Sequence, residues 1–226
     1  MSSIKHTVRA KAVTLKTARG RKPSSQRWLQ RQLNDPYVQE AQARGFRSRA
    51  AFKLLELNEK FHFLKAGITL IDLGAAPGGW TQVAVQKINP RHTGGKVIGI
   101  DLLEIQPITD ATLIQGDFLE TNQRQKIKEL IKEKVHVVIS DMAASTIGHA
   151  NTDHLRTIAL AEMAFNFARE VLMPGGTFIS KVFQGGTDPE LLKEMKRHFK
   201  TIKHVKPQAS RKESPEMYVI ALGFQQ

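Results

Sequence analysis

Short apolar runs rich in β-branched residues recur along the chain. They span residues 67–74, 96–103, 111–117, 135–142, 176–183 and 216–224. Runs of this length and composition are typical of buried β-strands. We therefore expect a strand at each of these places.

Helical spacing of apolar residues separates most of these runs, over residues 80–88, 120–133, 153–172 and 188–199. A further helix is expected from Arg49 to about Phe61, with Ser48 as its N-cap. In the segment VLMPGG, residues 171–176, Pro174 and two glycines are expected to end one helix before the next strand starts. The alternation predicts a doubly wound α/β domain, a mostly parallel sheet with helices on both faces. Such sheets bind ligands at the carboxyl ends of their strands.

The beginning of the chain differs from the rest. Residues 1–25 show no apolar period and are predicted to form a basic flexible arm. A single domain is expected over residues 26–226, with ordered structure starting near Trp28.

The formal net charge is +13, and the excess lies at the two ends of the chain. Residues 1–34 contain nine lysines and arginines and no acid, and residues 193–212 contain eight basic residues against Glu194 alone. Two basic segments on a nearly neutral body favour a polyanionic partner, most simply nucleic acid. A basic surface without such a partner is the alternative.

Residues 1–22 are rich in Ser, Thr, Lys and Arg and lack acids, which fits an RNA-binding arm as well as an organelle transit peptide. We expect a cytoplasmic protein, or a mitochondrial one if this segment is a transit peptide. A monomer is expected.

Composition excludes several kinds of site. The chain has no cysteine, so a disulfide framework, a thiolate nucleophile and a cysteine-bound zinc are ruled out. None of the eight histidines stands at metal-ligand spacing with another histidine or with an acid, so no metal site is expected. No apolar run is long enough to span a membrane.

The stretch IDLGAAPGGW, residues 71–80, leads from an apolar run into a loop with three glycines. A glycine backbone approaches a ligand more closely than a residue with a Cβ can. The spacing of Gly74, Gly78 and Gly79 is not that of a dinucleotide fingerprint, and the Lys-Ser/Thr of a P-loop is missing. Pro77 and Trp80 add rigid bulk. A cofactor with a nucleoside and no phosphate fits best, which favours S-adenosylmethionine over a nicotinamide.

An acid ends three successive apolar runs, at Asp72, Asp101 and Asp117. In a mononucleotide-binding half, the acid after the second strand commonly accepts hydrogen bonds from ribose hydroxyls, which fits Asp101. Asp117 would then face the base. For any one of these acids, a solvated turn is the alternative.

Four motifs resemble those of the RrmJ/FtsJ-type ribosomal RNA 2′-O-ribose methyltransferases. They are DLGAAPGGW at 72–80, SDMA at 140–143, KVFQG at 181–185 and SRKESPEMYVIA at 210–221, and the likeness extends upstream over residues 25–57. The resemblance implies a Rossmann-like class I methyltransferase that uses S-adenosylmethionine. It also implies an acceptor ribose in large-subunit (23S-type) ribosomal RNA, at a uridine, methylated during ribosome assembly.

The resemblance further implies a catalytic tetrad of Lys53, Asp141, Lys181 and Glu216. Cofactor contacts are expected from Gly78, Trp80, Asp101, Asp117 and Asp141.

Three tetrad residues also attract attention without the resemblance, and one of them, Glu216, opens the last expected strand. Lys181 lies inside the apolar run TFISKVF, where a lysine is costly to bury unless it is paired, and it is the expected general base. Asp141 follows the apolar run VHVVIS. Lys53 alone looks like a solvated helix charge, and only the resemblance points to it.

The chain departs from the family pattern after Asp141, where Ala144 and Ser145 stand in place of the usual Pro-Asn. We expect this to change the stiffness of the loop and the way the target ribose is held. A messenger-cap 2′-O-methyltransferase shares the tetrad and is the first alternative. A non-catalytic RNA chaperone or ribosome assembly factor with the same fold is the second.

Overall fold

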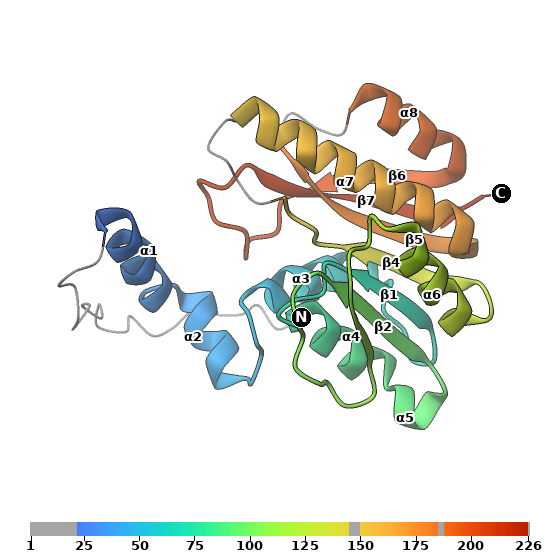
Figure 1. Cartoon of the computed structure of the whole chain (residues 1–226), viewed down its shortest axis with the longest axis horizontal. Coiled ribbons are helices and arrows are strands. Elements are labelled where there is room, and N and C mark those ends of the chain that lie inside the picture. The colour runs from blue at the N-terminus through green and yellow to red at the C-terminus, as the bar shows by residue number, and fades with distance from the viewer. Residues whose placement is uncertain (1–21, 145–149, 185–187, 226) are drawn as a thin grey trace.

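The computed structural model describes residues 22–144, 150–184 and 188–225, and a seven-stranded sheet runs through it (Figure 1). The strands are β1 (Thr69–Leu73), β2 (Lys96–Asp101), β3 (Thr112–Gln115), β4 (Val135–Ser140), β5 (Leu172–Phe183), β6 (Phe199–Val205) and β7 (Glu216–Phe224). Their order across the sheet is β3-β2-β1-β4-β5-β7-β6. Strand β7 pairs antiparallel with both of its neighbours, and the remaining pairs are parallel. The predicted mostly parallel sheet is confirmed.

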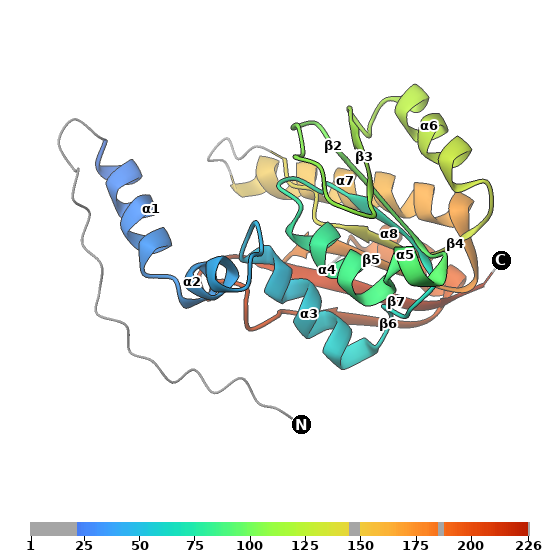
Figure 2. The ribbon, with the colours of Figure 1, turned by 90° about the horizontal axis from the view of Figure 1, so that it is seen from below.

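Helices cover both faces of this sheet, as the alternation of patterns predicts. They are α1 (Pro23–Leu33), α2 (Pro36–Ala43), α3 (Ala50–Phe61), α4 (Gly79–Ile88), α5 (Pro90–Thr93), α6 (Thr121–Ile131), α7 (Ala150–Val171) and α8 (Pro189–His198). Figure 2 shows α3 and α4 on one side of the sheet and α7 on the other. Because successive side chains of a strand point to opposite faces, Leu70 packs in the core under α3 and α4, whereas Ile71 packs in the core under α6, α7 and α8.

The connections from strand β1 create the place for a ligand. After β1 the chain builds β2 and β3 on one side, then returns to place β4 on the other side of β1. Leu73 lies opposite Ser140 in the β1–β4 pairing, and the Asp141 amide donates to the Leu73 carbonyl at 3.1 Å. Open α/β sheets bind ligands at the carboxyl edge of such a switch point. The loops that follow β1 and β4 therefore meet at the expected position.

Strand β6 was absent from the sequence expectation, in which only a helix was placed over residues 188–199. Phe199 is buried, but Lys200 and Lys203 are exposed, and β6 pairs with β7 alone. An edge strand buries little apolar surface and commonly carries lysines that oppose further pairing. Its charged sequence therefore resembles a solvated segment.

Three local expectations need correction. Helix α1 begins at Pro23, so ordered structure starts before the expected Trp28. The helix also crosses the expected boundary between arm and domain at residue 25. The division of the chain into an arm and a domain stays a prediction. The N-cap of α3 is Arg49, without a side-chain cap, and Ser48 is instead packed against Gly79 with its buried hydroxyl unpaired among the described residues.

The third correction concerns Pro174, which lies within β5 rather than between helix and strand. Leu172 already pairs with Val135, and the next pair in the ladder is Thr177 with Val137. The register shift leaves Pro174 in an irregular stretch of the strand. Proline is tolerated there because no ladder hydrogen bond depends on its missing N–H group.

Close approach of the loops after β1 and β4 requires glycine at position 74. Gly74 has φ +78°, and a Cβ there would lie 2.8 Å from the backbone of Met142. Gly94 has a similar φ of +74°, but a Cβ there would have nothing within 4 Å. The two positions therefore share backbone strain and differ in steric room.

We predict that Gly94→Ala lowers the free energy of unfolding by about 1 kcal/mol, the cost of a left-handed conformation. Gly74→Ala is expected to cost roughly 1 to 3 kcal/mol more, because backbone atoms must move. Urea unfolding of both variants measures the difference. Equal losses would show that the two loops do not meet closely.

Candidate active site

The loop after β1 is fixed to the end of β2 by backbone hydrogen bonds. The amides of Gly74 and Ala75 both donate to the carbonyl of Ile100, at 2.9 and 3.1 Å. The Asp101 carboxylate accepts from the Ala76 amide at 2.9 Å and from the Leu103 amide at 2.8 Å. Asp101 thus holds the glycine loop and its own turn in one arrangement.

A pocket opens beside this loop at the carboxyl edge of β1, β2 and β4, and we call it the strand-edge pocket. It encloses about 140 Å³. The pocket is lined by residues at or just after the carboxyl ends of β1, β2, β3 and β4 and by one residue of α7. They are Gly74, Ile100, Asp101, Leu102, Gly116, Asp117, Phe118, Leu119, Met142, Ala143 and Leu160. Two carboxylates on an otherwise largely apolar wall suit a nucleoside, which has a flat apolar base and polar hydroxyls.

The structure brings two of the five predicted cofactor residues, Asp101 and Asp117, into this lining, while Gly78, Trp80 and Asp141 are not part of it. Gly78, with φ +110°, is the N-cap of α4. The Trp80 side chain is buried, with its indole nitrogen donating to the Ala50 carbonyl at 2.7 Å. Any contact between Trp80 and a cofactor would therefore have to come from its backbone.

Arg47 secures the outer side of the glycine loop, a role that no pattern in the sequence indicates. Its guanidinium donates to the carbonyls of Pro77 at 3.3 Å, Gln106 at 2.6 Å and Pro107 at 2.8 Å. Three backbone carbonyls converge on one planar set of donors, which arginine matches and lysine does not. The convergence joins two loops and becomes visible only after folding.

The four predicted catalytic side chains gather in two ion pairs. Lys53 Nζ lies 2.6 Å from Glu216 Oε1, and Lys181 Nζ lies 3.2 Å from Asp141 Oδ1. Lys181 also donates to the Asp141 carbonyl at 2.7 Å. All four side chains are at least four-fifths shielded from solvent. Two lysines are therefore held out of water by two carboxylates.

Tyr218 joins these pairs, and sequence reasoning missed it. Its hydroxyl donates to Asp141 Oδ1 at 2.7 Å and accepts from Lys53 Nζ at 3.3 Å. Tyr218 lies opposite Lys181 in the β5–β7 pairing and two residues after Glu216, so the three side chains share one face of the sheet. The period of two in β7 is the signal that would have placed Tyr218 beside Glu216.

The acid–base properties of Asp141 and Tyr218 reflect this arrangement. Burial works to raise the pKa of Asp141, but the positive charges of Lys181 and Lys53 and the Tyr218 hydrogen bond outweigh it, so the pKa lies below its usual value. Burial, reinforced by the negative charges of Asp141 and Glu216, holds the pKa of Tyr218 well above its usual value. Asp141 therefore stays ionised, while Tyr218 stays a neutral donor.

Ser210 extends the network on the other side of the tetrad. Its hydroxyl donates to Glu216 Oε1 at 2.8 Å, the same oxygen that contacts Lys53. Of the loop that departs from the family pattern, Met142, Ala143 and Ala144 are described, whereas Ser145 lies outside the described residues.

Comparisons with known proteins agree with this geometry. Residues 46–224 match the model of the FtsJ-like methyltransferases. The chain belongs to this family. The methyltransferase is 57% identical over 214 residues to a protein of Paramagnetospirillum magneticum named ribosomal RNA large subunit methyltransferase E, covering 94% of this chain and 88% of the relative. A protein of the same name from Parvibaculum lavamentivorans is 55% identical over 225 residues, covering 96% and 88%.

Among solved structures, the methyltransferase resembles a Plasmodium falciparum protein provisionally described as a ribosomal RNA methyltransferase. The two are 32% identical with a TM-score of 0.70, over 79% of this chain and 98% of the other. The family resemblance inferred from four motifs and the Rossmann-like fold are thereby confirmed. Within the described residues of the methyltransferase, no group of three or more His, Asp or Glu side chains gathers as a metal site would require.

Asp72, the first of the three acids, lies within β1 and is fully buried. One carboxyl oxygen accepts from the Thr81 hydroxyl at 2.7 Å, and the other has no partner in the described part of the chain. Burial raises the pKa of Asp72 to about 7, with further upward contributions from Asp141 and Asp101. The Asp72–Thr81 hydrogen bond therefore joins β1 to α4, the two elements that the glycine loop connects.

We predict that Asp72 weakens the fold as the pH rises. Between its unfolded pKa near 4 and its folded pKa of about 7, the folded state keeps a proton that the unfolded state loses, so stability falls with rising pH. The total is about 4 kcal/mol at about 1.4 kcal/mol per pKa unit. In Asp72→Asn this contribution disappears, so the stability of the variant relative to the parent should rise between pH 4 and 7.

Urea unfolding of both proteins without cofactor across this pH range provides the measurement. The readout is how the difference in stability between the two proteins changes with pH, because carboxylates that do not interact with Asp72 titrate equally in both. A difference that does not vary with pH would contradict the assigned pKa.

Proposed function

We propose that this methyltransferase transfers the methyl group of S-adenosylmethionine to a ribose 2′-hydroxyl of large-subunit ribosomal RNA, at a uridine. The observation that carries the proposal is that the four predicted catalytic side chains form two shielded ion pairs joined by the buried Tyr218 hydroxyl, which contacts Asp141 of one pair and Lys53 of the other. The names of the relatives support the RNA, and the order of the motifs supports the 2′-hydroxyl.

The residues of the strand-edge pocket fit the cofactor. Asp101 and Asp117 would accept hydrogen bonds from the ribose hydroxyls and the adenine amino group, with Phe118 beside the base. Asp141, ionised and adjacent to Met142 in the lining, would attract the positively charged ammonium and sulfonium groups. The bound cofactor supplies an electrophilic methyl group that needs no further activation.

The protein must then hold the ribose in line and remove a proton from its 2′-hydroxyl. Lys181, as the neutral amine, is the proposed general base that accepts this proton, because its nitrogen stands at the carboxyl edge, oriented by two oxygens of Asp141. General-base catalysis of this kind contributes about 10²- to 10⁴-fold. Lys53, fixed by Glu216 and close to Tyr218, would stabilise the negative charge that develops on the oxygen. Alignment of the two reactants can contribute roughly 7 to 11 kcal/mol more.

The two basic segments, residues 1–34 and 193–212, are the proposed residues for RNA capture. The proposed partner is ribosomal RNA within the large subunit or its precursor. The curated relatives reported above are bacterial, which supports a cytoplasmic location and gives no support to a mitochondrial one. In the part of the chain that the structure describes, no helix is long and apolar enough to cross a membrane. A monomer remains part of the proposal.

Lys181→Ala tests the proposed function. We predict that methyl transfer to unmethylated large-subunit RNA is lost, while affinity for S-adenosylmethionine stays within a few-fold, because the lysine serves the acceptor and not the cofactor. Lys96→Ala, an exposed lysine at the amino end of β2, is the control and should behave as the parent. Mapping labelled methyl groups onto RNA from cells lacking the protein also identifies the nucleotide.

Turnover near the parent rate in Lys181→Ala would remove Lys181 from its role. If the parent protein methylates capped messenger RNA but not ribosomal RNA, the cap methyltransferase is favoured. Binding of S-adenosylmethionine without transfer to any RNA would favour the assembly factor.

Asp101→Ala is predicted to weaken S-adenosylmethionine binding by about 1 to 3 kcal/mol, the range for hydrogen bonds to a charged group. Part of this loss would come from loosening the glycine loop, because Asp101 also accepts from Ala76. Arg47→Met loosens the same loop from outside the pocket and is the matched control. Calorimetry should show a larger loss for Asp101→Ala than for Arg47→Met. Equal losses would mean that Asp101 acts through the loop alone.

A further inference from the structure

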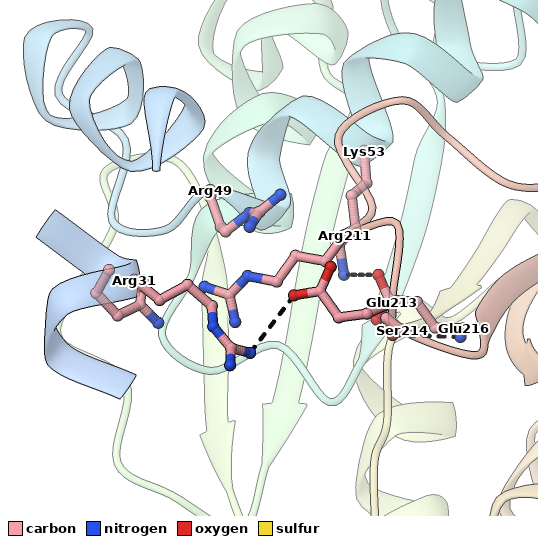
Figure 3. A pocket seen from close by; sticks show the side chains of 8 residues that line it. Arg31, Arg49, Lys53, Arg211, Glu213, Ser214 and Glu216 are labelled. Carbon is pink, nitrogen blue, oxygen red and sulfur yellow. Dashed lines mark hydrogen bonds and ion pairs between the residues drawn. The ribbon is translucent and has the colours of Figure 1, made fainter. Parts of the chain in front are cut away.

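A second pocket lies at the outer side of the tetrad, between α1, the start of α3 and the loop that joins β6 to β7 (Figure 3). We call it the basic pocket. It encloses about 310 Å³ and is lined by Arg31, Gln32, Arg49, Lys53, Arg211, Glu213, Ser214 and Glu216. Lys53 and Glu216 belong both to this lining and to the tetrad. A ligand in the basic pocket would therefore lie next to the acceptor ribose.

The pocket brings together the two basic segments found at the ends of the sequence. Arg31 comes from the first and Arg211 from the second, 180 residues further along the chain. In Figure 3 the side chains of Arg31, Arg49 and Arg211 extend toward the same region of the pocket. These arginines therefore form one localised basic site rather than part of a general basic surface.

Charge in the pocket is incompletely balanced. Asp35, the buried N-cap residue of α2, contacts both Arg49 and Arg211, so one carboxylate serves two arginines. Lys53 is matched by Glu216. Arg31 is matched by Glu213 at 3.4 Å. Four cations thus face three acids, and one positive charge remains.

The unmatched charge sits on arginines that are fixed in place. Arg49 also donates to the Ala209 carbonyl. Burial lowers the pKa of Arg49, which the attraction of Asp35 offsets only in part while Arg211 adds to the lowering. The Nε atoms of Arg49 and Arg211 are buried and have no hydrogen-bond partner among the described residues. These guanidinium groups are oriented before any ligand arrives.

Glu213 occupies the rim as a replaceable anion. The side chains of Arg31 and Glu213 are 52% and 63% exposed, and an exposed pair of this kind contributes little stability. A hydrogen bond from its own backbone amide lowers the pKa of Glu213; burial opposes this, and the charges of Arg31, Arg211 and Arg49 add to the lowering. The carboxylate therefore already lies in the field that an external anion would occupy.

We infer that the basic pocket binds a single phosphodiester of the RNA strand, the one that flanks the acceptor ribose, and that Glu213 competes with it for the arginines. This inference rests on the proposed function for the identity of the strand. A phosphodiester carries one negative charge, and the pocket has one positive charge unmatched even while Glu213 stays paired with Arg31. Arginine presents paired donors that match phosphate oxygens. This phosphate-binding site, which we call the phosphate seat, would hold the RNA strand on one side of the 2′-hydroxyl. Lys181 would contact the hydroxyl from the other side.

The first test measures RNA binding, so it does not depend on catalysis. Protein-free large-subunit RNA is titrated at several salt concentrations with the parent, Arg31→Gln, Arg211→Gln and Glu213→Gln. Each arginine variant should weaken binding and reduce the slope of log K against log salt by roughly 0.7 to 0.9, the effect of one lost phosphate contact. Glu213→Gln should tighten binding by roughly two- to fivefold at low salt, because the competing carboxylate is gone.

Arg91→Gln is the matched control, since Arg91 is also exposed and paired with an aspartate, Asp110 at 3.3 Å, but lies on α5 before the amino end of β2. It should leave affinity and slope unchanged. Arg211 contacts buried Asp35, so its variant is checked by thermal unfolding; if it does not fold, the exposed Arg31 and Glu213 decide. Arginine variants and Glu213→Gln that all behave like Arg91→Gln would overturn the inference.

The second test locates the phosphate. Once the methylated nucleotide is mapped, RNA oligonucleotides with one neutral methylphosphonate on either side of it are compared. At one of the two linkages, the methylphosphonate should cost the parent about as much affinity for RNA as the substitution Arg211→Gln does. The Arg211→Gln protein should lose little further affinity when that linkage is made neutral. Additive losses at both linkages would mean that the arginine acts only through its long-range field. Binding that follows this pattern in a protein without methyl transfer would refute the proposed function and leave the phosphate seat standing.

Discussion

The hydroxyl of Tyr218 is the contact on which the active site depends. It touches both ion pairs, donating to Asp141 and accepting from Lys53. Charges removed from water are costly unless each is paired and hydrogen-bonded in good geometry. Without the Tyr218 hydroxyl, Asp141 and Lys53 would each lose a hydrogen-bond partner in a place largely shielded from water. A tyrosine with a raised pKa supplies that partner, because it remains protonated where an acid would ionise.

The carboxylates at the switch point form a second constraint. Asp72, Asp101 and Asp141 lie at adjacent strands, and the negative charges of the last two add to the burial that raises the pKa of Asp72. Lys181 and Lys53 offset this charge at Asp141 only. The edge near the glycine loop therefore retains negative potential, which favours a cationic ligand. The basic pocket on the far side of the tetrad has the opposite sign, so the two reactants would approach from regions of opposite charge.

Much of this architecture was predictable because its signals are local. Six of the seven strands are apolar runs, and Lys181 stood out since a lysine inside such a run needs a partner. Strand β6 could not be recognised because an edge strand has few buried positions. Lys53 has no local signal, and its partner Glu216 is far along the chain. Tyr218 and Arg47 act through contacts between loops and strands that no spacing in the sequence encodes.

Strand β7 lies between β5 and β6 and carries both Glu216 and Tyr218. Every other described strand is made before it during synthesis, since translation proceeds from the N-terminus. A nascent chain can therefore build the glycine loop, the strand-edge pocket and the Lys181–Asp141 pair while Lys53 still lacks its partners Glu216 and Tyr218. Because β7 is the last described strand along the chain, the reaction centre can be completed only after this strand has left the ribosome. The ribosome is also the particle whose RNA the finished protein is proposed to modify.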